Sequence, residues 1–542
     1  MALNSSGPIS LGGSTVGQSI NLELGVSATA LASINSTPFR NLAGVASGAI
    51  SLSNFYGKSS VTYYIIGVTR DTGPSGPWYD NQMYDIDSSG NHYIILNSNA
   101  PASIVVKTTA TGGSATCFSQ VFTNSVGVTT YSYEQTIAVA SGGNLLHGGL
   151  LYAQVPTGGN YSTFTAGQRT SFITSGSQST IGTALKYTPT VWGVSTTYSG
   201  MNSSYAASAV DGSGNYYTRV NGYNYYFYGY DPCSGDPIYD MKGQAMFLCK
   251  YSAGGSLSSI LLVSQDSGYS YAYPGQTMVM ASGGIMISGP QGSPGPGALG
   301  GNVQCLTLVN SAMSAITWTK YYYTTNPWGK GTEEYAYVSR DSSDNSYLTY
   351  PAYYNPVNNT GTVLWKINSS GAVQWVTGFT ISGVNIAPRG SCSDSSGNTY
   401  IVGSANPGSG YQTYVWKVNS SGVLQWGTVI SCSTSGKQMN GRVPRVMPDG
   451  SIAVYIPTYP DWSPHFFITL PAAGGKTGTF TNSGCSITLA NATITSYNIS
   501  GTGTYSTGNR TNSGFGTTGQ TGTFSLGVSY GTPTATVSST VI

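Results

Sequence analysis

The sequence predicts an all-β protein, and three observations support this: few charges, many aromatic residues, and turn residues at regular intervals. Charged residues make up only 7% of the chain and aromatic residues 12%, while glycine supplies 73 of the 542 positions. Ordinary globular domains carry roughly 25% charged residues, and disordered chains are usually poor in aromatics. Short strands rich in tyrosine, threonine and valine, separated by glycine, serine and asparagine turns, fit this composition.

Two closely matching segments predict β-hairpins. Residues 365–375 read WKINSSGAVQW and residues 416–426 read WKVNSSGVLQW, so eight of eleven positions are identical. Each has an apolar strand, an Asn-Ser-Ser-Gly turn, and a returning strand that ends in tryptophan. Asparagine and glycine favour such turns because asparagine bonds to its own backbone and glycine tolerates positive φ.

A second motif, Asp-x-Ser-Gly-Asn-x-Tyr, marks the start of each repeat. Its clearest copies begin at Asp87, Asp211, Asp341 and Asp394, and looser copies begin near 141, 282 and 449. Successive starts lie 53 to 71 residues apart, and a hairpin candidate follows each. Seven copies of a four-strand unit predict a seven-bladed β-propeller over residues 61–480, with loop insertions in the longer repeats. A β-sandwich or a β-solenoid is the structural alternative.

Together, the two motifs resemble the bacterial and phage β-propeller repeat family, whose pattern is D-x-S-G-N-x-Y followed by K-x-[ND]-x-x-G-x-x-x-W. The resemblance covers about residues 75–475 and is strongest in the fifth and sixth copies.

The N-terminal part, residues 1–60, predicts a small, mostly helical head. Residues 14–25 (STVGQSINLELG) and 36–47 (STPFRNLAGVAS) have the apolar spacing of short helices. In the second segment, Ser36 or Thr37 could cap the helix, with Pro38 in its first turn.

Three pieces of this head resemble the N-terminal module of many tailed-phage tail fibres and virion structural proteins. They are Ser6–Leu11 (SGPISL), Asn21–Gly25 (an NxELG segment) and Ala49–Lys58 (AISLSNFYGK). The resemblance implies attachment to a phage particle. The residues that it assigns to virion attachment are Ile9, Leu11, Leu22, Leu24, Phe39, Leu42, Ile50, Leu52, Phe55, Tyr56 and Gly57.

The C-terminal segment, residues 481–542, is rich in glycine, threonine and serine and alternates polar and apolar residues as strands do. This pattern leaves three arrangements open: a small β-domain, strands that close the propeller, or strands that pair with another subunit.

The residue inventory argues against an enzyme. Only four glutamates are present, and most of the 14 aspartates belong to turns, whereas glycoside hydrolysis needs two carboxylates that face one cleft. The sialidase motif S-x-D-x-G-x-T-W is absent, as are GxSxG, HExxH and a phosphate loop. The three histidines are solitary in the sequence. We therefore expect no catalytic residues and no cofactor.

Charge and cysteine patterns exclude further functions. The net charge of +2, with scattered basic residues, argues against nucleic-acid binding. No apolar run approaches the ~20 residues of a membrane span, and the N-terminus lacks the features of a secretory signal. The seven cysteines have no zinc-site spacing, so we expect unpaired thiols in a protein that is assembled in a reducing host cytoplasm.

The Asp-Ser-Ser-Gly loops are also candidate Ca²⁺ sites, since they resemble the first half of an EF-hand loop. The bidentate glutamate at position twelve is missing, however. Asp341 with Asp344 is the best candidate pair. We interpret the loops as turns and expect no metal.

A dense aromatic stretch is the candidate recognition surface. Residues 216–230 hold seven tyrosines and one phenylalanine, and tyrosine offers both a flat apolar face for sugar rings and a hydroxyl group. The candidate receptor contacts are Tyr223, Tyr225, Tyr226, Phe227, Tyr228 and Tyr230. Packing between blades or against a neighbouring subunit is the competing interpretation, and the same ambiguity holds for the cluster from Trp318 to Trp328.

These observations favour a non-enzymatic virion protein, a tail fibre or tip appendage. It would attach to other virion proteins by its N-terminus and present the propeller to a host-surface glycan or receptor. The alternative is an architectural or decoration protein of the tail, collar or capsid that makes no host contact. Either would be located in the virion, and the resemblance favours a homo-oligomer, with a trimer as the commonest form.

Overall fold

Strands form nearly all of the regular structure that the computed structural model describes. The described residues are 3–56 with short gaps, 63–70, 84–97, 102–152 without 124–128 and 141–142, parts of 170–204, 208–230, 237–266 without 254–256, 278–291 without 283, 303–324, 336–354, 359–499 without 409 and 461–462, 502–506, 527–531 and 535–542. The all-β prediction is confirmed.

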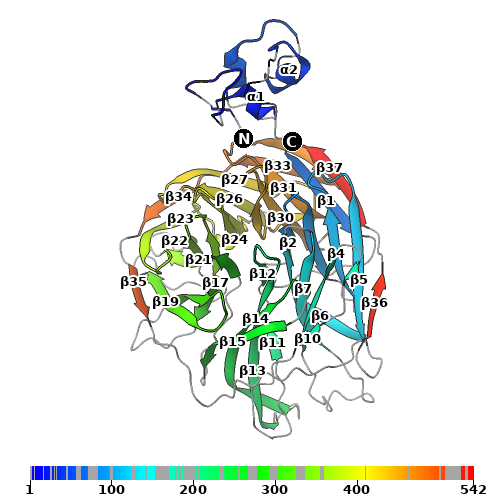
Figure 1. The fold of residues 1–542 in the computed structure, drawn as a ribbon, viewed down its shortest axis with the longest axis vertical. Coiled ribbons are helices and arrows are strands. Elements are labelled where there is room, and N and C mark those ends of the chain that lie inside the picture. Colours follow the sequence, from blue (N-terminus) through cyan, green and yellow to red (C-terminus); the bar gives the residue numbers. More distant parts are fainter. Residues whose placement is uncertain are drawn as a thin grey trace.

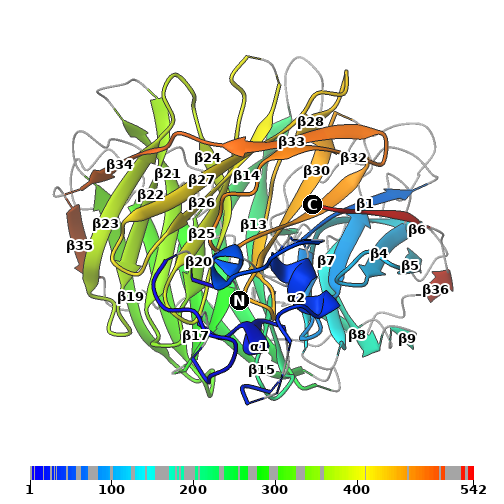
Figure 2. The ribbon, with the colours of Figure 1, turned by 90° about the horizontal axis from the view of Figure 1, so that it is seen from above.

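The strands form six hydrogen-bonded sheets that are arranged around a common centre as a β-propeller (Figures 1 and 2). All pairings between named strands are antiparallel. The first sheet contains β2 (Tyr84–Ile86), β3 (His92–Asn97), β4 (Ala102–Thr108), β5 (Ala115–Thr123), β6 (Thr129–Val139), β7 (Leu145–Tyr152), β8 (Thr170–Ser177), β9 (Thr180–Ile181), β10 (Leu185–Tyr187) and β36 (Gly527–Gly531). The second contains β11 (Asn202–Ser204), β12 (Ser208–Val210), β13 (Tyr216–Tyr230), β14 (Pro237–Tyr251) and β15 (Leu257–Asp266).

The next two sheets follow the repeats at 282 and 341. The third contains β16 (Met278–Ala281), β17 (Gly284–Gln291), β18 (Val303–Asn310), β19 (Ile316–Thr324) and β35 (Thr502–Ser506). The fourth contains β20 (Tyr337–Arg340), β21 (Ser346–Tyr354), β22 (Asn359–Ile367), β23 (Val373–Thr380) and β34 (Thr495–Asn498).

The last two sheets combine distant parts of the chain. The fifth contains β24 (Ala387–Ser393), β25 (Thr399–Ala405), β26 (Gln412–Val418), β27 (Leu424–Cys432), β32 (Gly478–Asn482) and β33 (Cys485–Asn491). The sixth contains β28 (Gln438–Met439), β29 (Pro444–Val446), β30 (Ile452–Tyr459), β31 (His465–Leu470), β1 (Tyr64–Arg70) and β37 (Ala535–Val541).

The expected count of seven separate blades is wrong, because the described sheets number six. The repeats that begin at 87 and 141 share the ten-stranded first sheet. They are joined where β5 pairs with β6, through Phe122 with Thr130 and Thr123 with Thr129. The repeat pattern marks the turns between strands but does not show whether adjacent repeats are hydrogen-bonded to each other.

The ring is closed by strands from both ends of the body. β1, from the N-terminal side, pairs with β31 from the last repeat, and β37 then pairs with the other edge of β1. The body therefore starts and ends in one sheet, as Figure 1 shows near the labels β1, β31 and β37.

The described strands of the C-terminal segment each add an outer strand to one of five sheets. In chain order, β33 pairs with β27, β34 with β23, β35 with β19, β36 with β5 and β37 with β1. Figure 2 shows these strands along the periphery. We call β33 to β37 the C-terminal belt. In the described part of residues 481–542, β33 to β36 add to sheets of the propeller, and β37 takes part in the ring closure.

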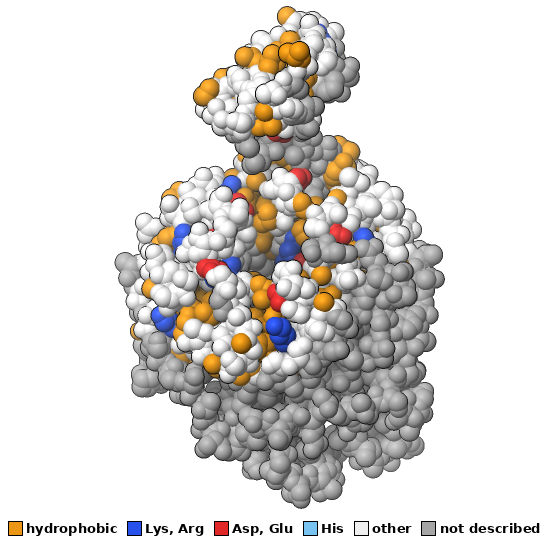
Figure 3. Space-filling model, viewed as in Figure 1, with side chains coloured by type: hydrophobic (Ala, Val, Ile, Leu, Met, Phe, Trp, Pro, Cys, Tyr) orange, Lys and Arg blue, Asp and Glu red, His pale blue; other side chains and the backbone are white. Residues whose placement is uncertain are grey.

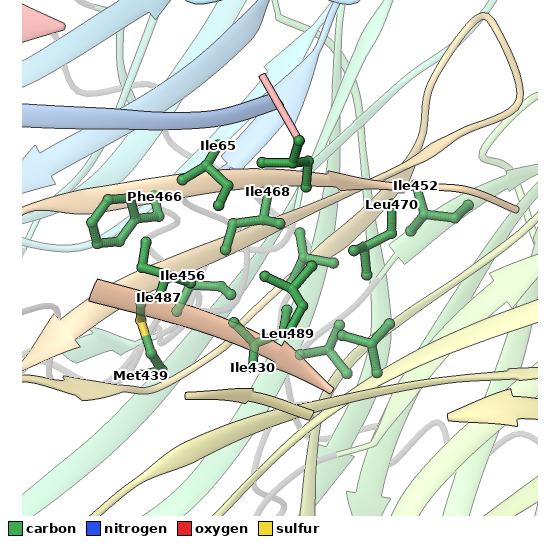
Figure 4. Close-up of a cluster of buried hydrophobic side chains, with 14 of the residues drawn as sticks. Ile65, Ile430, Met439, Ile452, Ile456, Phe466, Ile468, Leu470, Ile487 and Leu489 are labelled. Atoms are coloured by element: carbon green, nitrogen blue, oxygen red, sulfur yellow. The ribbon is translucent and has the colours of Figure 1, made fainter. Parts of the chain in front are cut away.

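Hydrophobic clusters fill the space between neighbouring sheets. One cluster joins the fifth and sixth sheets and includes Ile65, Ile430 and Phe466 (Figure 4). The adjacent residues Ile66 and Phe467 belong to a different cluster, between the sixth and first sheets. Successive side chains of a strand point to opposite faces, so the sixth sheet is buried on both sides.

The head is mostly irregular, so the prediction of a mostly helical head is wrong. Its helices are α1 (Ile20–Glu23), α2 (Thr37–Ala43) and the 3₁₀ helix η1 (Leu52–Phe55). Pro38 does lie in the first turn of α2, whereas Ser19, which the sequence analysis did not consider, caps α1 by accepting from the Leu22 N–H at 3.3 Å. Segments this short are not stable helices alone, and glycine and serine follow each within a few residues.

The repeated turns provide a test of the motif interpretation. Gly397 has φ of 80°, and a Cβ built there would lie 2.6 Å from the Tyr347 hydroxyl oxygen. We expect Gly397→Val to lower the free energy of unfolding by about 1–3 kcal/mol. The matched control is Gly212→Ser at the second position of another copy, where φ is not positive and nothing lies within 4 Å. Equal stability of the two variants in urea unfolding would contradict the interpretation.

Candidate functional site

The four clear Asp-x-Ser-Gly-Asn-x-Tyr copies share one geometry. In the copy at Asp341, carboxylate Oδ1 accepts from the backbone N–H groups of Ser343 and Asn345, both at 2.9 Å. Oδ2 accepts from Asn345 Nδ2 at 2.8 Å and from the Tyr347 hydroxyl at 2.9 Å. The copies that begin at Asp87, Asp211 and Asp394 make the same four bonds. Each carboxylate is thus engaged within its own turn.

These bonds determine the electrostatics of the loops. Burial alone would raise the pKa of Asp341, but the hydrogen bonds from Asn345, Tyr347 and Ser343 outweigh it and hold the pKa below its ordinary value. The carboxylate is therefore kept ionised, with its oxygens facing donors rather than an open space.

The best candidate Ca²⁺ pair does not converge on a common point. Asp344 accepts from Arg340 Nη2 at 2.8 Å and from the Ser282 N–H at 3.1 Å, whereas Asp341 accepts within its own turn. Asp344 has φ of 63° at the place where other copies have glycine. In the part of the chain that the structure describes, no group of three or more His, Cys, Asp or Glu side chains is placed to hold a metal.

We expect Asp341→Ala to lower the free energy of unfolding by about 2–3 kcal/mol, because it leaves several donors without their carboxylate partner. Ser343→Ala, which alters an exposed residue of the same turn, is the control and is expected to change stability by less than about 0.5 kcal/mol. Neither EDTA nor added Ca²⁺ should shift the Tm of the unaltered protein. A Ca²⁺-dependent rise in Tm that Asp341→Ala abolishes would support a metal site instead.

Lysine and tryptophan side chains of one sheet hold the turn of the next. Lys366 Nζ and Trp375 Nε1 of the fourth sheet both donate to the Ser420 carbonyl of the fifth, at 3.1 and 3.0 Å. Lys417 and Trp426 of the fifth sheet donate in the same way to the carbonyl of Ala472, at 3.0 and 3.1 Å. This explains the repeated W-K…W spacing, and it is a structural role that the sequence analysis did not assign.

Lys366, Lys417 and two further lysines cover the tyrosines of the Asp turns. Lys107, Lys250, Lys366 and Lys417 lie over the rings of Tyr93, Tyr217, Tyr347 and Tyr400, at 5.3 to 5.6 Å from the ring centroids. Such cation–π contacts stabilise by roughly 0.5–2 kcal/mol each. The two repeated motifs thus form one structural unit in each repeat that has both.

The seam between the first and sixth sheets holds a charged pair and an aromatic cluster. Arg445 Nε donates to Asp85 Oδ1 at 2.9 Å, and Asp85 Oδ2 accepts from the Val139 N–H at 2.9 Å. His92 stacks on Phe467 with 4.8 Å between ring centroids, and its Nδ1 lies 2.8 Å from the Tyr84 hydroxyl. These contacts join the first repeat to the last.

The predicted receptor contacts lie on the outer half of a long hairpin. β13 and β14 pair from Tyr216–Tyr251 out to Tyr230–Pro237. β15 pairs with β14 only as far as Gln244. From Tyr225 onward, the described partners of β13 are all on β14, so this part is a two-stranded arm. Tyr223, Tyr225, Tyr226, Phe227, Tyr228 and Tyr230 are on β13, with irregular pairing between Asn224 and Tyr225 and between Phe227 and Gly229.

The inner end of that hairpin and the second aromatic cluster contribute to packing. Tyr216 and Tyr217 are buried, as are Tyr321 and Tyr322 of β19. Trp318 donates to the Ser369 carbonyl at 3.3 Å, in the manner of the other inter-sheet contacts. Positions 325–328 of this cluster lie outside the described residues.

The described attachment residues of the head fall into three groups by burial. Phe39, Leu42 and Phe55 are buried in the core of the head with Leu3 and Ile20. Four others are half-buried, namely Ile9, Leu22, Leu24 and Ile50. Three are exposed, namely Leu11, Leu52 and Tyr56. Gly57 lies outside the described residues.

Exposed apolar side chains are concentrated on the head. Among the described residues, the large hydrophobic side chains that are exposed number seven, and four are on the head: Leu11, Leu31, Leu52 and Tyr56. Figure 3 shows hydrophobic side chains at the surface of the head. The other three, Val423, Tyr459 and Val541, are scattered over the much larger body.

The head and the hairpin arm lie at opposite ends of the molecule. Figure 1 places the head beside the strands that close the ring, and β13 at the far end of the long axis. None of the described helices is long and apolar enough to cross a membrane.

Neither a protein family nor a curated protein matches the chain. Solved structures with a similar arrangement include a Trypanosoma rangeli sialidase in complex with the inhibitor DANA. It shares 10% identity, with a TM-score of 0.34, over 65% of this chain and 57% of that one. A Dyadobacter fermentans protein of unknown function shares 9% identity, with a TM-score of 0.29, over 67% and 94% of the two chains.

A xylan beta-1,4-xylosidase from Bacillus halodurans shares 8% identity, with a TM-score of 0.25, over 76% of this chain and 96% of that one. The chain thus spans a little more than half the length of the sialidase and nearly all of the other two. Similarity this low carries no argument about activity.

Proposed function

We propose that the chain is a non-enzymatic structural protein of a tailed-phage particle, an appendage that attaches through its head and presents the propeller to the host surface. The observation that carries the proposal is the separation in Figure 1: the head, which holds four of the seven exposed large apolar residues in the described part of the chain, is opposite the end with the tyrosine-rich arm. A protein that bridges a particle and a cell needs two such distant surfaces.

The head suits a docking role because its apolar surface is exposed while its fold is held by its own core. Arg40 connects the loops of the head, donating through Nη2 to the Gly48 carbonyl at 3.0 Å and through Nη1 to the Val45 carbonyl at 3.3 Å. The Tyr56 hydroxyl donates to the Gly7 carbonyl at 2.6 Å. Exposed apolar patches on an ordered unit mark interaction sites, and the partner is another virion protein.

The hairpin arm suits recognition because tyrosines combine apolar ring faces with hydroxyl groups at low cost in rotamer entropy. The arm extends beyond Gln244, the last residue of β14 that pairs with β15. The ligand class that we propose is a surface glycan. A symmetric oligomer, with a trimer favoured, would present several arms together.

Attachment is tested first by deletion. A protein that lacks residues 1–58 should be folded and soluble, and it should no longer enter particles when it is the sole copy of this chain. Point variants refine the test: Leu11→Asp with Leu52→Asp should reduce incorporation at least tenfold, while Val423→Asp, an exposed position on the body, should not. Normal incorporation of the head variants would overturn the attachment role.

Recognition is tested separately, with Tyr225, Tyr226 and Tyr228 all changed to serine and with Tyr459→Ser as the exposed control. The triple variant should enter particles normally but bind host cells at least tenfold more weakly. Binding to cells from which surface polysaccharide has been removed should be equally weak. If the unaltered protein does not bind host cells, the architectural role replaces the receptor-binding one.

A further inference from the structure

Two cysteines meet where the C-terminal belt begins. Cys432 is the last residue of β27 and is opposite Ile487 of β33, while Cys485 is the first residue of β33. Cys485 is two positions from Ile487, so it is on the same face of the sheet as Cys432. Both belong to the cluster between the fifth and sixth sheets, and their thiol groups are hydrogen-bonded to each other.

The turn beside Cys485 holds both terminal strands of the body. Asn482 Nδ2 donates to the Ile65 carbonyl of β1 at 2.8 Å and to Thr540 Oγ1 of β37 at 3.0 Å. Ser483 Oγ is 2.6 Å from Ser538 Oγ of β37. The cysteine pair is therefore next to the point where the first strand, the last strand and the start of the belt come together.

We propose that Cys432 and Cys485 form a redox-active thiol pair, whose disulfide fixes the start of the belt to the fifth sheet beside the ring closure. Cys485 is at the end of its strand, directly after the turn residues Ser483 and Gly484, which have φ of 48° and 75°.

The pair has the chemistry that such a reaction needs. Cys432 is half-buried, and the hydrogen bond from the Cys485 thiol, with further bonds at Thr434, lowers its pKa to about 6. The thiolate is the nucleophile in disulfide exchange. By contrast, burial raises the pKa of Cys305 to about 11 and of Cys249 and Cys392 to about 12. Among these described cysteines, oxidation should therefore select the pair.

The oxidant is a small-molecule disulfide such as oxidised glutathione. The Cys432 thiolate attacks one sulfur of the oxidant, forms a mixed disulfide and releases one glutathione thiolate. Cys485 then loses its proton and attacks the Cys432 sulfur, which breaks the mixed disulfide and releases the second glutathione. In total, two cysteine thiols are oxidised, and one glutathione disulfide is reduced to two thiols.

The test treats the full-length native protein with oxidised glutathione and then measures intact mass and disulfide-linked peptides. The unaltered protein should lose about 2 Da and give a linked peptide that joins Cys432 and Cys485. Cys485→Ser should instead accumulate a glutathione adduct on Cys432, because no resolving thiol is present. Cys432→Ser should give neither product. Cys305→Ser, which removes another partly exposed cysteine, should behave like the unaltered protein.

A second measurement tests whether the disulfide stabilises the protein by fixing the start of the belt to the fifth sheet. Oxidation should raise the Tm of the unaltered protein, dithiothreitol should reverse the rise, and the Cys485→Ser variant should show no such rise. Three results would overturn the proposal: a stable glutathione adduct on the unaltered protein, a Cys432–Cys485 link that forms only after denaturation, or a disulfide that leaves the Tm unchanged.

Discussion

Lowering the pH from 7 to 4 is expected to remove on the order of 6 kcal/mol from the free energy of unfolding, through two buried histidines. His92 and His465 lie in the first and sixth sheets, and both contribute to the aromatic cluster at the seam. His465 Nδ1 is 2.9 Å from the Tyr455 hydroxyl, and the Tyr455 ring packs at a tilt against the rings of Tyr84 and Phe467.

The direction of this pH dependence follows from the direction in which the histidine pKa values are shifted. Burial lowers the pKa of each histidine from 6.5 to about 4. Between these values the unfolded chain binds protons that the folded protein does not. The contribution of each histidine to the free energy of unfolding is therefore fully present above pH 6.5. It declines by about 3 kcal/mol for each histidine as the pH falls toward 4. The charged groups near the cluster include Arg445 and Asp85, beside Tyr84, Asp87, near His92, and Arg442, near Tyr455.

Urea unfolding at a series of pH values measures this dependence. His92→Gln and His465→Gln should each remove about half of the pH dependence between 6.5 and 4, whatever their effect at neutral pH. The unaltered protein should show little change between pH 6.5 and 8 from these groups. A free energy of unfolding that is constant from pH 6.5 to pH 4 would contradict the burial of neutral histidines at the seam.

Deletion of residues 535–542 is expected to lower the free energy of unfolding by on the order of 4 kcal/mol and to cause self-association. β37 pairs with β1 from Tyr64–Val541 to Arg70–Ala535. The Ile542 side chain is buried in the cluster between the fifth and sixth sheets, and its N–H donates to the Tyr63 carbonyl at 2.9 Å. The deletion exposes the edge of β1, and exposed edges pair with other chains.

Two point variants measure how much of the effect of the deletion comes from the buried Ile542 side chain. Ile542→Ala should cost about 2 kcal/mol through lost burial, whereas Val541→Thr, at an exposed position, should stay within about 0.5 kcal/mol of the unaltered protein. Light scattering should show the truncated protein, but neither point variant, as a species larger than the assembly of the unaltered protein. Unchanged stability and an unchanged assembly size after the deletion would mean that the belt is not part of the folded body.

The local chemistry of the repeats could be predicted from the sequence, since it depends on residues that are close in the chain. The turn at Asp394 has the predicted form, with Gly397 at positive φ and Asn398 bonded to the carboxylate. The strand that follows this turn is β25, which begins at Thr399. Even the copy with Asp344 in place of glycine keeps the turn, because neighbouring residues supply the same donors.

Long-range pairing could not be predicted in this way. β33 and β34 alternate polar and apolar residues, which fits a separate domain, an intermolecular strand or a belt equally well. Their partners on β27 and β23 are far away in the sequence, and no local pattern specifies them. The count of sheets could not be predicted for the same reason, because it depends on whether Phe122 and Thr123 pair with the next repeat. The cysteine pair could not be predicted either, because its two members come together only when β33 pairs with β27.

Cryo-electron microscopy of tailed-phage particles that carry this chain tests the central claim most directly. The proposal predicts that residues 3–56 are buried against another virion protein, that the propeller lies outside this contact, and that the arm of β13 and β14 points away from the particle. A map in which the arm or a face of the propeller contacts the particle, while the head is exposed to solvent, would contradict it.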